Sequence, residues 1–103
     1  MTRYLNFSED FTEKILSGEK RATLRLGIKD YVPGEIVIIR AGEHEIARAR
    51  IVKVRIMKLR EISEDDVRMD GFESRDSLIS ALRRFYGEIE EDDEFTQIVF
   101  EII

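Results

Sequence analysis

The sequence predicts an α+β domain in which helices flank a small, curved or closed mixed β-sheet. Three observations support this class. Every second residue from Thr96 to Ile102 is apolar or β-favouring, as in a half-buried strand. Residues 75–86 have helical apolar spacing between a capping serine and a glycine. Residues 46–60 have strand character throughout, but their apolar face changes twice without a turn residue, as in curved sheets.

The N-terminal third predicts a strand, a helix and a second strand. Residues 4–7 are a short strand, and Ser8 is the predicted N-cap of a helix with acidic residues in its first turn. Phe11 and Ile15 form the apolar stripe of this helix. Gly18 ends it, because glycine readily adopts the left-handed conformation that follows a helix. A strand is then expected over residues 22–26.

The rest of the chain contains three further strands and two helices. Residues 32–34 read Val-Pro-Gly, a turn sequence, and lead into a strand over residues 35–40. After the long strand, Ser63 caps a short helix that runs through residue 66. A second helix follows over residues 75–86, and its apolar stripe predicts that Phe85 lies in the core and that Tyr86 can point into a cleft.

Composition limits the chemistry available to the chain. With 103 residues, it has room for one domain, 1–103. It has no cysteine, and His44 is the only histidine, so neither a thiolate nor a two-histidine metal site can form within one chain. We expect no metal and no cofactor. The chain has no long apolar run and no apolar signal core at its start, which predicts a cytoplasmic protein without membrane spans. Its many charged residues are typical of a thermophile.

Charge is distributed unevenly along the chain. Residues 40–60 carry seven basic and two acidic side chains, whereas residues 61–103 carry four basic and fourteen acidic ones. The basic strand could contact phosphates through Arg48, Arg50, Lys53 and Arg55. Alternatively, these side chains pair with carboxylates of the acidic C-terminal third, and this second interpretation is the one we predict.

The segment Gly18–Arg25 contains the strongest candidates for chemistry. Strand alternation places Thr23 and Arg25 on the face opposite Ala22 and Leu24, and Lys20 precedes them in the connection from the helix. A hydroxyl, an ammonium and a guanidinium group would then converge on one surface. Such a set suits an anion or a polar heterocycle. We expect Lys20 and Arg25 to be exposed.

The same segment resembles a known family. Its pattern Gly18-x-Lys20-x-x-Thr23-x-Arg25, after a helix and before a Pro-Gly turn, is similar to the GxKxxTxR signature of the ASCH domain, and the order of the later elements is also similar. The resemblance covers essentially the whole chain. It implies a PUA-like β-barrel with a cleft beside the motif and a role in binding RNA or modified nucleosides. The candidate ligand-binding residues are Lys20, Arg21, Thr23, Arg25 and Asp70.

One branch of that family consists of small amidohydrolases that deacetylate N4-acetylcytidine. By resemblance, Lys20 would be the base and Thr23 the nucleophile, and a carboxylate before the long helix would complete the site. Asp70 is the matching carboxylate, with Glu73 as a less well aligned alternative. The main hypothesis is a protein that binds RNA or a modified nucleoside. The alternatives are an amidohydrolase, with Lys20, Thr23 and Asp70 as catalytic residues, and a module that binds a protein partner.

Overall fold

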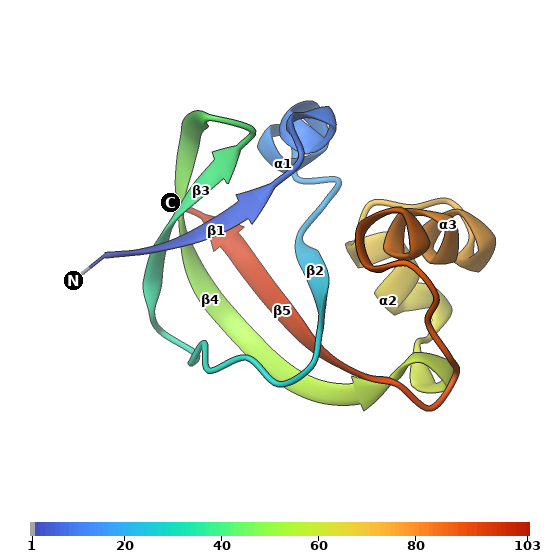
Figure 1. Cartoon of the computed structure of the whole chain (residues 1–103). Helices are drawn as coiled ribbons and strands as arrows, with labels where there is room; N and C mark the ends of the chain where they lie inside the picture. The colour runs from blue at the N-terminus through green and yellow to red at the C-terminus, as the bar shows by residue number, and fades with distance from the viewer. Residues whose placement is uncertain (1) are drawn as a thin grey trace.

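The computed structural model describes residues 2–103, which form one curved sheet with helices around it (Figure 1). The sheet has the strand order β1-β3-β4-β5-β2. Its strands are β1 (Arg3–Phe7), β2 (Ala22–Leu26), β3 (Ile36–Ala41), β4 (His44–Lys58) and β5 (Glu94–Ile102). The helices are α1 (Thr12–Ser17), α2 (Glu64–Met69) and α3 (Arg75–Tyr86), with short 3-10 helices η1 (Glu9–Phe11) and η2 (Leu59–Glu61). The predicted α+β class is confirmed.

The sheet is mixed and remains open along one side. β1 pairs with β3 in parallel, and every other neighbouring pair is antiparallel. β1 and β2 stand at the two ends of the strand order, so the curved sheet forms a half-barrel rather than a closed one. In Figure 1, β2 runs between the β1 side of the sheet and helices α2 and α3. This open side is where the candidate site lies.

The first change of apolar face in β4 is a β-bulge. The β4–β5 register pairs Ile51 with Phe100 and Lys53 with Val99, which leaves Val52 as the extra residue. A bulge inserts one unpaired residue and shifts the side-chain alternation. It therefore brings Lys53 to the same face of the sheet as Arg50.

The second change of face in β4 has a different cause. No register shift separates Val54 from Met57. Instead, the sheet is covered on both faces here, with Val54 packed against one hydrophobic cluster and Met57 buried in another. Apolar residues therefore occur at both odd and even positions in this half of β4, because both faces of the sheet are buried there.

The two hydrophobic clusters share β5. Ile98 and Phe100 belong to the cluster inside the curve of the sheet, together with residues of β1, β3, β4 and α1. Phe95 belongs to the cluster under α2 and α3. Successive strand residues point to opposite faces, so β5 supplies both cores. The central part of β5 is accordingly buried at every position from 95 to 98.

The helix ends follow the expected local rules with two differences. Gly18 has a φ of 84° and ends α1, as predicted. The Ser8 side chain forms no capping hydrogen bond, and the first turn is the 3-10 helix η1, so α1 begins only at Thr12. Ser63 caps α2 through a reciprocal pair of hydrogen bonds with Asp66, and that helix continues to Met69 rather than ending at residue 66. Within residues 2–103, no helix is long and apolar enough to cross a membrane.

Candidate functional site

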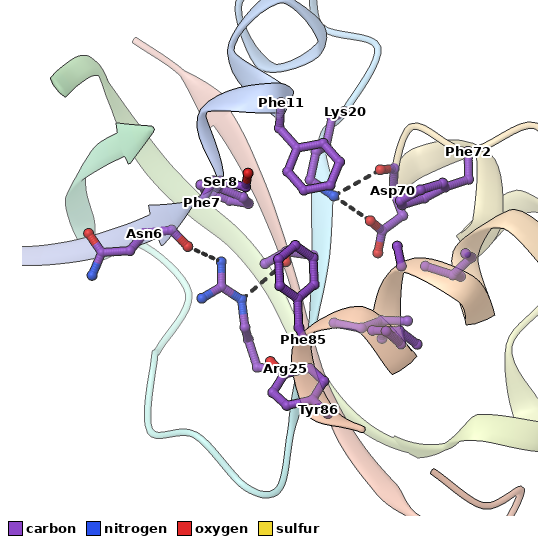
Figure 2. Close-up of a pocket in the computed structure, with 15 residues that line it drawn as sticks. Asn6, Phe7, Ser8, Phe11, Lys20, Arg25, Asp70, Phe72, Phe85 and Tyr86 are labelled. Atoms are coloured by element: carbon purple, nitrogen blue, oxygen red, sulfur yellow. Dashed lines mark hydrogen bonds and ion pairs between the residues drawn. The ribbon is translucent and has the colours of Figure 1, made fainter. Parts of the chain in front are cut away.

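A cavity of about 230 Å³ lies at the open side of the half-barrel (Figure 2). The end of β1, the turn η1, strand β2, the connection after α2 and helix α3 all contribute to its wall. Figure 2 shows the Lys20 side chain beside Asp70 at one end of this space and the Arg25 side chain beside Asn6 at the other, with Phe85 between them in this view. The cavity therefore brings together segments that are far apart in the sequence.

Lys20 and Asp70 form a buried pair in this wall. The Lys20 ammonium donates a hydrogen bond to the backbone oxygen of Asp70 over 2.9 Å and also bonds to its carboxylate. Lys20 is only 3% exposed, and Asp70 is equally buried. The expectation that Lys20 is exposed was therefore wrong: the α2–α3 connection covers it. The Asp70 side chain reaches the Lys20 ammonium directly.

Gly71 permits this close approach. Its φ is 88°, which side-chain-bearing residues rarely adopt, and a Cβ at this position would lie 3.1 Å from the Lys20 Cβ. The Gly71 carbonyl also accepts a hydrogen bond from the Lys14 ammonium over 2.7 Å. The turn after α2 is thus held against both lysines. A glycine at position 71 is therefore one of the features that build the site.

Burial determines the electrostatics of the pair. Desolvation lowers the pKa of Lys20 and raises the pKa of Asp70, because each loses hydration of its charged form. Their mutual attraction and hydrogen bond act in the opposite direction. The Lys20 ammonium also lies 4.7 Å from the centre of the Phe11 ring, a cation–π distance. The site therefore contains a buried, hydrogen-bonded pair of ionisable groups beside an aromatic face.

Arg25 and Thr23 face the same space, as strand alternation predicts. Arg25 Nε donates to Thr23 Oγ1 over 3.1 Å, and Nη2 donates to the Asn6 carbonyl over 2.6 Å. The second bond joins β2 to β1 across the opening of the half-barrel. The guanidinium lies 4.9 Å from the centre of the Phe7 ring, and burial lowers its pKa. Arg25 is therefore half-buried rather than exposed as expected, and its hydrogen bonds already position it.

Two of the candidate residues lie elsewhere. Arg21 is exposed and does not line this cavity; it borders a shallower depression beside the end of α1 and β5. Glu73 is exposed and is absent from the cavity wall, so Asp70 is the carboxylate at the site. His44 is exposed at the start of β4. Among the described residues, no cluster of three or more His, Asp or Glu side chains could hold a metal ion.

The aromatic wall of the cavity was not recognised from the sequence. Phe85 is 49% exposed and borders the cavity, so its placement in the core was wrong, whereas Tyr86 does reach the cleft. Phe7, Phe11 and Phe72 complete this wall. From the sequence, the spacing of these aromatic residues predicted only that they are apolar positions of strands and helices. Nothing in those local patterns indicates that strand, turn and helix aromatics meet at one opening.

The basic strand is only partly neutralised. Arg55 pairs with the buried Asp66 of α2 over 2.9 Å, and Arg50 pairs with Glu101 over 3.4 Å at the surface. Although burial opposes its charge, hydrogen bonds from Ser63 and Gln97, together with the positive charge of Arg55, hold the pKa of Asp66 below its usual value. In the part of the chain that the structure describes, Arg48 and Lys53 form no ion pair. The predicted pairing thus holds for two of the four side chains.

The fold and the cavity define a small α+β half-barrel protein with a polar, aromatic-walled cleft. The chain belongs to the ASCH domain family: the model of that domain matches residues 3–103. The resemblance noted in the sequence is thereby confirmed, as is the PUA-like architecture that it implies. None of the curated proteins matches the chain.

Solved structures share this fold at low sequence identity. An ASCH domain from Lactobacillus crispatus is 19% identical with a TM-score of 0.80, over 97% of this chain and 79% of that one. A Pyrococcus furiosus protein is 23% identical with a TM-score of 0.68, over 100% of this chain and 98% of that one. An ASCH protein from Zymomonas mobilis is 18% identical with a TM-score of 0.68, over 95% of this chain and 65% of that one.

Proposed function

We propose that the cavity binds a modified nucleoside, either free or as one nucleotide of an RNA. The observation that carries this proposal is the combination of buried polar groups with an aromatic wall around one small space. Arg25 offers a planar fork of donors, Thr23 a hydroxyl, and the Lys20–Asp70 pair a donor and an acceptor. Phe85 and Tyr86 provide faces on which a base can stack.

The size of the cavity favours a single nucleoside over a longer segment. Its volume of about 230 Å³ is below the ~300–1,000 Å³ typical of pockets for drug-sized ligands. An RNA would therefore insert only one unstacked base, as single-stranded RNA does in other proteins. The net charge of −5 is consistent with this mode, because it disfavours nonspecific coating of a polyanion.

Calorimetric titration tests the proposal. The probes are cytidine, N4-acetylcytidine and a short single-stranded RNA carrying N4-acetylcytidine at one position. Arg25→Ala should weaken binding at least tenfold, about 1.4 kcal/mol. Arg21→Ala is the matched control, since it removes a neighbouring guanidinium that lies outside the cavity, and it should leave affinity unchanged. Equal affinities for the two variants, or no binding of any probe, would overturn the proposal.

One observation favours a second candidate, an amidohydrolase acting on an acylated cytidine: Lys20, Thr23 and Asp70 line the same cavity. Burial lowers the pKa of Lys20, and a neutral Lys20 amine would accept the Thr23 hydroxyl proton. Thr23 Oγ1 would then bond to the acyl carbon, the carbon–nitrogen bond would break, and the leaving amine would take a proton from Asp70 or Lys20. Water would hydrolyse the resulting ester and release acetate.

We expect little or no acetate release from this protein. Lys20 is bonded to Asp70, and no hydrogen bond joins Lys20 to Thr23 within residues 2–103, where the Thr23 hydroxyl accepts from Arg25 instead. Incubation with N4-acetylcytidine, followed by chromatography for cytidine, measures this directly. Turnover above about 1 per second, abolished by Thr23→Ala, would make the enzyme the correct assignment.

A further inference from the structure

Strand β2 is an edge of the sheet, and its backbone groups divide into two sets. β5 lies on one side of it, and no strand lies on the other within the described chain. The Phe100 amide donates to the Arg21 carbonyl, and the Gly27 amide donates to the Glu94 carbonyl. In an antiparallel ladder with this register, Thr23 and Arg25 direct their N–H and C=O groups toward β5. Leu24 and Leu26 direct theirs away from it.

The backbone of Leu24 therefore has hydrogen-bonding capacity without a partner. Across residues 2–103, no group of the protein accepts from the Leu24 N–H or donates to its C=O. The residue is only 4% exposed. More than nine in ten buried backbone groups in proteins are paired, so an unpaired buried peptide group indicates a missing partner. Leu26, with the same orientation, is half-buried, and bulk water can reach it more readily.

The cavity extends around the open edge of β2 at this residue. Thr23 and Arg25 project from one face of β2, and both line the cavity. Leu24 projects from the other face into the cluster under α3, and it lines the same cavity together with Leu82. A single space that contacts both faces of an edge strand must pass the edge itself. The Leu24 N–H and C=O thus border the ligand space, whereas Leu26 does not line it.

We propose that the Leu24 peptide groups read the hydrogen-bonding edge of the ligand, as a neighbouring strand would. This inference rests on the proposed function and narrows the ligand class. The bound base would be a planar heterocycle with an acceptor and a donor on the edge that faces β2. Arg25 and the Lys20–Asp70 pair would contact its remaining polar atoms. A base lacking either group would leave a buried peptide group unpaired, which is a strong basis for rejection.

Amide hydrogen exchange measured by NMR tests this assignment. The probes are cytidine and N4-acetylcytidine at saturating concentration, as judged by the calorimetric titration. Exchange at the Leu24 amide should slow at least tenfold on binding, and its proton resonance should move. Leu26 is the matched control, because its amide has the same orientation but lies outside the cavity. Its exchange should remain unchanged.

A backbone ester provides the second test. Replacing Leu24 by the corresponding α-hydroxy acid during chemical synthesis removes its N–H and preserves its side chain. Affinity for the bound probe should fall about fivefold, and the same replacement at Leu26 should have no effect. If probes bind in an Arg25-dependent manner but neither Leu24 measurement responds, the inference is wrong and the proposed function stands. If no probe binds, both the inference about Leu24 and the proposed function are wrong.

Discussion

Replacing Asp70 with Asn should destabilise the fold strongly. The variant retains the shape of the side chain and removes its charge, which leaves the Lys20 ammonium buried at 3% exposure without a counter-ion. Breaking a buried ion pair by removing one partner costs ~3–5 kcal/mol. The lower end applies here, because the Asp70 backbone oxygen still accepts from Lys20 and the Phe11 ring lies 4.7 Å away. For a domain of this size, ~3 kcal/mol corresponds to a fall in Tm of at least about 12 °C.

Chemical and thermal unfolding followed by far-ultraviolet circular dichroism measure this loss. The matched control is Glu73→Gln, which neutralises an exposed carboxylate three residues away and should change stability by less than ~0.5 kcal/mol. The double variant Lys20→Met/Asp70→Leu removes both charges and should return to within ~1 kcal/mol of the parent. If Asp70→Asn is as stable as Glu73→Gln, the pair is neither dry nor structurally important, and the reasoning is refuted.

Two further predictions concern the Arg55–Asp66 ion pair and the titration of Lys20. Arg55→Glu should lower the free energy of unfolding, measured by urea titration, by ~2–3 kcal/mol, because it places a carboxylate beside the buried Asp66. Arg48→Glu, at an exposed position, is the control and should change that free energy by less than ~0.5 kcal/mol. Burial lowers the pKa of Lys20 below its ordinary value of 10.5, so the unfolded state binds more protons between the folded pKa and 10.5. The raised pKa of Asp70 gives the opposite slope just above its ordinary value of 3.8. The stability of the parent relative to the Lys20→Met/Asp70→Leu variant should therefore rise with pH in the alkaline part of the Lys20 window, just below pH 10.5, and a fall there would contradict the pKa direction of Lys20.

Local signals in the sequence were sufficient for most of the secondary structure. Gly18 ends α1 and Ser74 caps α3, because these depend on backbone conformation and on hydrogen bonds to nearby residues. Strand alternation also predicted that Thr23 and Arg25 share one face of β2, because it too depends only on local backbone conformation. The spacing of the Lys20, Thr23 and Arg25 motif also identified the family, since its residues are close in the sequence.

Tertiary packing decided what the sequence could not. Lys20 is buried because the turn containing Asp70 and Gly71 folds over it, a contact between residues about fifty positions apart. The aromatic wall and the unpaired Leu24 peptide exist only because β2 forms an edge opposite α3. Local sequence patterns depend on side-chain spacing within one element and carry no information about which elements become neighbours. The identity of the motif residues was therefore readable in advance, whereas their burial, their partners and the space that they enclose were set by the arrangement of the sheet and helices.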